Sequence, residues 1–484
     1  MRSWWRGLAM AAVAWTGIVG CGSEAPKRNP QASAPSSPAP AVSVSGAPAP
    51  SVPAVSSESV KVLSSRGTVL VRDENKGGTY RTIDKGSSVG PGETVLSFHD
   101  GVIASANGKV QATLRSDLSG KNPLPVLESA VATRTPSAAG IDLELKLGRG
   151  RVDFVNTAKE GKVTVKIVGP FTSSDLVLAS PGTRVVVELY GRWLPGSRFA
   201  PLPENTKFVP ENSPVLRWMV LVLKGEVEIQ HPLSSFSLKA PPGNALIQAQ
   251  TINAERPAPE HLDSLPDWLN EDPKDPEVAK TKPALEKLAA ALATHGDAVK
   301  AFEEFSQSKD PVERIIAIYG MAAIDELEKM FIIIRSSKQE DVVDEGIIAL
   351  RHYLGRAPGV DQAFYKFLMS HQINNQPVFK PSQAEALIDL VYGFNEEQKA
   401  QPTTYSYLLK QLSNKRQAFR GLAIWHLERL VPDGQKIGYD PTDEESAREL
   451  SIKKWRDKLT ELKKLPEPPP AAKPPVAKPA APKP

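Results

Sequence analysis

The sequence predicts a multidomain protein in which an all-β N-terminal domain is followed by an all-α C-terminal domain. The apolar residues favour period two, or short buried runs, between residues 59 and 254, whereas from residue 284 they recur with a period near 3.6. A proline-rich stretch separates the two regions, and two more Pro/Ala-rich segments flank them. The length of 484 residues accommodates about two to four domains.

These changes in composition divide the chain into six segments. We expect a lipoprotein signal peptide, a lipidated cysteine with a Pro/Ala/Ser tether, a β domain, a proline-rich junction, a helical domain and a Pro/Ala/Lys tail. Their boundaries are 1–20, 21–58, 59–254, 255–283, 284–465 and 466–484. The tether and the tail hold too few large apolar residues to offset the entropy of ordering, so we expect both to be disordered. Attraction of the tail lysines to an anionic envelope polymer is a second interpretation.

The lone cysteine of the chain follows a short apolar run. Arg2 and Arg6 precede the apolar stretch 7–20, which is shorter than the roughly 20 residues that cross a bilayer as a helix. The segment Ile18-Val19-Gly20-Cys21 resembles the bacterial lipobox, in which the cysteine is diacylglycerylated and becomes the mature N-terminus. We therefore expect Cys21 to be the lipidation site, with up to three acyl chains, and an ordinary secretory signal is the alternative. We therefore expect an extracytoplasmic location, on the inner or outer membrane of a bacterium.

The β domain is predicted from short apolar segments that end at glycines. Val163, Val165 and Ile167 alternate before Gly169, and the segments 219–223 and 227–229 flank Lys224-Gly225, which is typical of a hairpin turn. About ten strands with no helical segment between them favour a sandwich, a barrel or a stacked roll.

Several glycine-containing segments of this region resemble the FecR-like extracytoplasmic domain. They are Ile83-Asp84-Lys85-Gly86 with the glycine turn 89–95, Leu147–Val152, Ala179–Thr183 before Val185, and Leu223–Val227. In the signalling proteins of that family the domain is an outer sensor that follows a transmembrane helix and a segment contacting a sigma factor. This chain has no second apolar run long enough to cross a membrane. The resemblance therefore implies the fold and a binding or sensing role, without direct contact to a sigma factor.

The helical domain is predicted from amphipathic stripes. Asp310-Pro311 is typical of an N-cap followed by proline at the first helical position. The segments 310–317 and 416–430 resemble helices of HEAT-type repeats, and an irregular helical bundle is the alternative. We interpret Trp425 and Trp455 as packing residues, with a ligand cage as the alternative. Tyr392, Tyr405 and Tyr407, with the neighbouring basic residues, are interpreted in the same way, with a binding surface as the alternative.

Two sequence patterns suggest chemistry, but neither has the structural context that its chemistry needs. Gly86-Ser87-Ser88-Val89-Gly90 matches a nucleophile-elbow string, but Pro91-Gly92 and a strand follow where that motif needs a helix. Gly148-Arg149-Gly150 lacks the third glycine of a phosphate loop and precedes a strand. The seven histidines are scattered singly. We predict no catalytic, cofactor-binding or metal-ligating residues and no cofactor.

The composition restricts the class of partner. The net charge of +4 is too small to indicate nucleic-acid binding, and one cysteine excludes an intramolecular disulfide. The sequence therefore predicts a non-catalytic, lipid-anchored envelope protein that binds or senses an unidentified envelope protein or cell-wall polymer. Two alternatives are an envelope hydrolase with unrecognised acidic catalytic residues and a sensor that relays through a separate transmembrane partner. We also expect the segments 59–254 and 284–465 to fold separately.

Overall fold

The computed structural model describes residues 59–466 with short internal gaps. The gaps are residues 75, 119–126, 172, 232–233, 241–243, 251–257, 264–268, 270–271, 338, 371 and 374–375. The expected signal peptide, the lipidation site Cys21 and the tether lie outside the described residues, as does the tail from residue 467.

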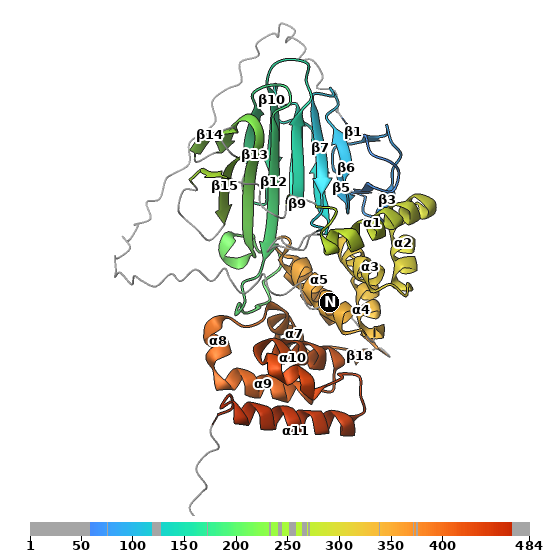
Figure 1. The fold of residues 1–484 in the computed structure, drawn as a ribbon, viewed down its shortest axis with the longest axis vertical. Helices are drawn as coiled ribbons and strands as arrows, with labels where there is room; N and C mark the ends of the chain where they lie inside the picture. The colour runs from blue at the N-terminus through green and yellow to red at the C-terminus, as the bar shows by residue number, and fades with distance from the viewer. Residues whose placement is uncertain are drawn as a thin grey trace, which may run out of the picture.

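The structure confirms a β-rich N-terminal region followed by a helical region. Figure 1 shows the strands at one end of the long axis, helices α7 to α11 at the other, and α1 to α5 between them. The strands of the first region are β1 Val60–Val62, β2 Leu70–Asp73, β3 Arg81–Thr82, β4 Ser88–Val89, β5 Glu93–Ser97, β6 Gly101–Ala104, β7 Val110–Arg115, β8 Ser129–Thr133, β9 Leu143–Asn156, β10 Val163–Val168, β11 Ser173–Leu178, β12 Arg184–Arg192, β13 Val215–His231, β14 Ser234–Ala240, β15 Asn244–Gln250 and β16 Glu260–Leu262.

The strands form two layers that share β9 and β13. One layer runs β4-β1-β6-β7-β9-β12-β13-β15-β16, and the other runs β3-β2-β5-β8-β9-β10-β11-β13-β14. All described pairs in these layers are antiparallel except β9 with β10, which is parallel. Apolar side chains from both layers, such as Val110 of β7 and Leu176 of β11, form one buried core.

The glycine signal at Lys224-Gly225 was interpreted wrongly. Lys224-Gly225 was expected to be a hairpin turn, but β13 continues through these residues. Leu143, Leu145 and Leu147 alternate in the sequence before Gly148, and β9 likewise continues through this glycine. Gly225 has φ of +82° and lies where β13 leaves its pairing with β12 and begins to pair with β11. A glycine in this conformation bends the strand instead of ending it, which lets one strand join two layers.

The helical region begins earlier than expected. Its elements are α1 Pro276–His295, α2 Ala298–Ser306, α3 Pro311–Ala323, α4 Leu327–Ser336, α5 Glu340–Gly355, α6 Val360–Ser370, the hairpin β17 Gln372–Ile373 and β18 Gln376–Pro377, α7 Pro381–Tyr392, α8 Glu396–Ala400, α9 Pro402–Leu412, α10 Gln417–Leu430 and α11 Glu445–Glu461. The expected start at residue 284 was wrong because Asp275 caps α1 through the backbone N–H of Glu277, with Pro276 at the first helical position. The expected start of α3 at Asp310-Pro311 is confirmed.

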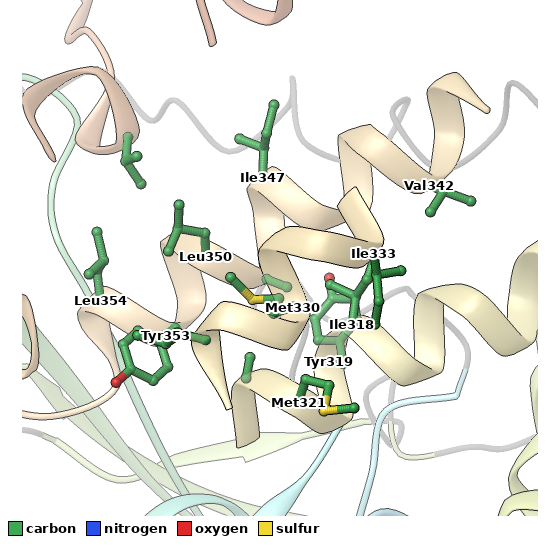
Figure 2. Close-up of a cluster of buried hydrophobic side chains, with 14 of the residues drawn as sticks. Ile318, Tyr319, Met321, Met330, Ile333, Val342, Ile347, Leu350, Tyr353 and Leu354 are labelled. Carbon is green, nitrogen blue, oxygen red and sulfur yellow. The ribbon is translucent and has the colours of Figure 1, made fainter. Parts of the chain in front are cut away.

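Successive helices pack against one another through apolar faces. Figure 2 shows the part of the core formed by α3, α4 and α5, where side chains such as Ile318, Met330 and Leu350 meet. Short helices such as α2 and α4, of 9 and 10 residues, are not stable alone, so contact between neighbours supplies much of the stability of the region.

The two regions share a hydrophobic core. Leu70, Tyr80, Leu96 and Phe98 of the β region belong to the same buried cluster as the helical side chains. The rings of Phe98 and Phe302 meet edge to face with centroids 5.3 Å apart. Burial of shared apolar surface stabilises the contact between the regions, which the expectation of separate folding did not include.

Candidate functional site

A buried polar cluster lies where the sheet meets the helices, and it joins Glu128, Arg149 and His352. Arg149 Nε donates to Glu128 Oε1 over 2.7 Å, and His352 Nε2 lies 3.2 Å from the same oxygen. Arg149 also donates from Nη2 to the carbonyl oxygen of Ala323, over 2.9 Å, at the end of α3. All three charged or polar side chains are buried. We call these three residues the junction triad.

A bulge in β9 brings Arg149 to this position. The pairing of β8 with β9 shifts register, since Ala130 pairs with Arg149 but Val131 pairs with Leu147, which leaves Gly148 as the extra residue. Gly150, on the other side of Arg149, has φ of +86°. A Cβ on Gly150 would overlap Ser129 and the backbone of Glu128. The Gly-Arg-Gly sequence therefore serves a strand bulge that directs one arginine into the helical region.

The triad stabilises the ionised form of Glu128. Burial alone would raise the pKa of this carboxyl, but the charges and hydrogen bonds of His352 and Arg149 outweigh it and lower the pKa to about 2. Two atoms of the triad, Glu128 Oε2 and His352 Nδ1, are buried and have no hydrogen-bond partner among the described residues. The imidazole of His352 is covered by Tyr190 of β12, whose ring lies 5.5 Å away at an interplanar angle of 15°.

A second polar contact crosses the junction at Asp325, just after α3. This carboxylate accepts a hydrogen bond from Arg72 of β2 over 2.9 Å and pairs with Arg356 at the end of α5. Burial would raise the pKa of Asp325, but the two arginines together lower it. The guanidinium of Arg72 also lies over the ring of Tyr80, 4.5 Å from its centroid. One carboxylate thus connects a strand with two helices.

A third contact lies where the chain leaves β12. Trp193 Nε1 donates to the carbonyl oxygen of Leu354 over 3.2 Å, and its ring stacks on Tyr392 with centroids 5.0 Å apart. A Cβ on Gly191 would overlap the carbonyl oxygen of Gly355. The end of β12 therefore packs backbone to backbone against the end of α5.

Two carboxyl groups on α5 and α10 have unusual proton affinity. Burial raises the pKa of Glu345 to about 7, although Tyr319 Oη donates a hydrogen bond to this carboxyl over 3.0 Å. Burial and the charges of nearby acids raise the pKa of Glu428 to about 7 as well. Asp344 lies close to both and pairs with Arg429 over 2.8 Å.

The residues that the sequence analysis named as possible catalytic or binding residues lie on a strand or pack in the helical core. Ser88 lies on β4, and the strand β5 follows it after a turn. Trp425, Trp455, Tyr392 and Tyr405 are buried, and Tyr407 is partly buried against the helical core, as the packing interpretation expected.

Sequence reasoning missed all three members of the junction triad. Arg149 was noticed only within the FecR-like segment Leu147–Val152 and the incomplete phosphate-loop pattern, and His352 only as one of the scattered histidines. Gly150 beside Arg149 was the one sequence signal that could have indicated the bulge in β9. Nothing in the sequence indicated that Glu128 and His352 would be the partners of Arg149.

The described part of the chain contains no candidate metal site and no candidate membrane span. No group of three or more His, Cys, Asp or Glu side chains there could hold a metal ion. Over the same residues, the helices are all too short or too polar to cross a bilayer.

No protein-family model, curated protein or solved structure matches this chain.

Proposed function

We propose that the protein is a lipid-anchored cell-envelope protein that binds or senses a protein or cell-wall partner and catalyses no reaction itself. In this proposal Cys21 carries the lipid and a proline-rich tether links it to the folded part. A FecR-like β domain and HEAT-like helical repeats supply the binding surfaces.

The observation that carries this proposal is the arrangement of the buried junction triad. The carboxylate of Glu128 is held by Arg149 and His352, two residues from opposite sides of the junction. A reaction centre needs a base or nucleophile that faces a substrate, whereas these groups face one another. The geometry therefore favours a structural joint that holds two surfaces in a fixed relation, as a binding protein needs.

Site-specific photo-crosslinking in the producing cell tests the proposal. A photoreactive residue is placed at Ile332 or Leu450, which are exposed large apolar residues of the helical region, or at Leu63 in the β region. We expect a crosslinked envelope protein or glycan fragment from at least one position. Cys21→Ala should remove the protein from the membrane fraction and weaken the crosslink. Normal lipid attachment and membrane retention in Cys21→Ala would contradict the anchor, and no product at any position would contradict the binding role.

A hydrolase is a second candidate because Glu345 and Glu428 both have pKa values of about 7. A carboxyl group that holds its proton near neutral pH can act as a general acid. This alternative predicts hydrolysis of a cell-wall polymer by the purified protein, with at least a hundredfold loss in Glu345→Gln or Glu428→Gln. Release of fragments at the same rate from wild-type protein and both variants, or no release at all, would contradict it.

A further inference from the structure

Three turns and one strand bend lie together at the end of the β region that faces away from the helices. β12 runs from Arg184 at this end to Gly191, whose backbone packs against Gly355 of α5. Figure 1 shows this end of the strands on the side of the β region opposite to α5. The turns are residues 105–109, 157–162 and 179–183, and the bend is Lys224-Gly225 of β13, where Lys224 pairs with Arg184. We call these residues the distal loop surface.

Hydrogen bonds fix the three turns to one another. Asn156, the last residue of β9, is buried, and its Nδ2 donates to the carbonyl oxygen of Gly161 over 3.1 Å. Its own carbonyl oxygen accepts from the backbone N–H of Gly182 over 2.8 Å. Thr157 Oγ1 donates to the carbonyl oxygen of Gly108 over 2.9 Å. The turns therefore form one surface on a rigid scaffold, which is the usual construction of a recognition surface.

The distal loop surface carries an excess of positive charge. Lys109, Lys159, Lys162 and Lys224 are exposed, and Glu160 is the one acid among these residues. The whole chain has a net charge of only +4. Four lysines against one acid are therefore a strong local bias, and such a patch attracts anions.

Three of the four lysines have no counter-ion on the protein. The carboxylate of Asp142 lies beside the surface, but its Oδ1 is 3.6 Å from Lys109 Nζ and its Oδ2 accepts from the backbone N–H of Thr164. Lys159, Lys162 and Lys224 have no ion-pair partner among the described residues.

The position of Lys224 connects the bend of β13 with the third turn. Its Nζ lies 3.5 Å from the position that a Cβ on Gly182 would take, so this side chain extends over the turn 179–183. The backbone N–H of Gly182 in turn bonds Asn156, directly before the turn that carries Lys159 and Lys162. The unpaired lysines therefore belong to one connected set of turns.

The chain enters the β region at this same end. Lys61 of β1 is exposed and pairs with Ala104 of β6, directly before the turn 105–109. Residues 22–58 separate Cys21 from the first described residue. A coil of that length spans about 30 Å. A lipid on Cys21 therefore keeps the distal loop surface, and not the helical end, closest to the bilayer.

We infer that the distal loop surface contacts the anionic lipid headgroups of the bilayer that holds the anchor. The inference rests on the proposed function, because it needs Cys21 to be lipidated. Lysines near an anionic bilayer are attracted to it, and a lipid chain with a basic patch is a common pair of membrane signals. A bilayer is favoured over a cell-wall polymer because the anchor brings headgroups to this end of the molecule. The lysines then set the orientation, with the β region on the membrane and the helical region open to a partner.

Energy transfer in reconstituted vesicles tests the contact. The lipidated full-length protein carries a donor dye at Ser180→Cys, exposed on the distal loop surface, or at Thr460→Cys, exposed on α11. The vesicles contain acceptor-labelled lipid in phosphatidylcholine, with or without phosphatidylglycerol. We expect stronger transfer from position 180 than from position 460, and a further increase at position 180 when phosphatidylglycerol is present. This increase should disappear in about 1 M salt, where the screening length falls to about 3 Å.

Two triple variants locate the contact. Lys159→Gln, Lys162→Gln and Lys224→Gln together should abolish the response to phosphatidylglycerol, and each alone should lower the ratio of membrane-facing to free molecules about fivefold. The matched control combines Lys453→Gln, Lys454→Gln and Lys463→Gln, which removes the same charge from exposed positions in the helical region and should keep the response. All six side chains are exposed, so both variants should keep the fold.

Two results would overturn the inference. One is transfer from position 180 that does not respond to phosphatidylglycerol, and the other is a full response in the triple variant of the distal loop surface. If the wild type alone binds soluble polyphosphate but shows no response to the vesicles, the surface belongs to an anionic polymer instead.

Flotation of the vesicles in the same high salt separates this inference from the proposed function. Salt screens the lysines but leaves the acyl chains inserted, so flotation reports on the anchor alone. Flotation without any response to phosphatidylglycerol contradicts the lysine contact only. Loss of flotation in the wild type contradicts the lipid anchor, and the inference with it.

Discussion

Glu128 and His352 are 224 residues apart in the chain, yet Oε1 of the carboxylate lies 3.2 Å from Nε2 of the imidazole. Glu128 directly precedes β8, and His352 lies on α5, so this contact connects the two regions of the protein. Arg149 completes the cluster from β9. Because all three side chains are buried, each depends on the others for compensation of its charge or its hydrogen bonds.

Replacement of Glu128 should destabilise the protein strongly. Glu128→Gln removes the charge that compensates Arg149, and breaking a buried ion pair from one side costs about 3–5 kcal/mol. The measurement is the free energy of unfolding in urea. Glu396→Gln is the control, since the Glu396 side chain is 89% exposed in its pair with Lys399. Its cost should stay below about 1 kcal/mol. Equal effects of the two substitutions would contradict a stabilising role of the triad.

The contribution of Glu128 should depend on pH in the acid range. The pKa of Glu128 is lowered to about 2 in the folded protein, below the value of 4.5 for an unperturbed carboxyl. The carboxylate therefore stabilises the fold above about pH 4.5, and this contribution is lost as the pH falls toward 2. The difference in unfolding free energy between wild type and Glu128→Gln should shrink over that interval. A difference that stays constant down to pH 2 would show that Glu128 acts by packing alone.

Glu345 should behave in the opposite way. Its pKa is raised to about 7, so the protonated carboxyl suits the fold and ionisation destabilises it as the pH rises through 7. Glu345→Gln keeps an acceptor for Tyr319 and removes the ionisation. The variant should be more stable than the wild type by about 1–3 kcal/mol at pH 8.5 and nearly equal to it at pH 5. Thermal unfolding across this range measures the effect, and a variant that is less stable at pH 8.5 would contradict it.

The contact between the end of β12 and the end of α5 leaves no room for a side chain at Gly191. Gly191→Ala places a Cβ on the carbonyl oxygen of Gly355, and relief requires the strand and the helix to move apart. We expect a loss of about 2 kcal/mol or more in unfolding free energy. Gly421→Ala is the control, because its Cβ would meet nothing within 4 Å on helix α10. It should be neutral or stabilise by up to about 1 kcal/mol. Loss of stability in both variants alike would contradict the close contact.

The sequence predicted the elements better than their contacts. Val163, Val165 and Ile167 form the buried face of β10, and Asp310 caps α3, because both signals are local. The turn predicted at Gly225 was wrong, because a glycine in a bent strand and a glycine in a turn look alike in sequence. The contacts of Glu128 with Arg149 and His352 depend on how the sheet docks on the helices, and no local pattern encodes that docking.

Hydrogen exchange of the full-length protein at increasing denaturant concentration tests most directly whether the sheet and the helices form one body. Peptides from β9 and β12 report on the sheet, and peptides from α5 and α10 report on the helices. Because the regions share a core and the junction triad, we expect both sets of peptides to lose protection at the same denaturant concentration. Full exchange of α5 and α10 while β9 and β12 stay protected would contradict it.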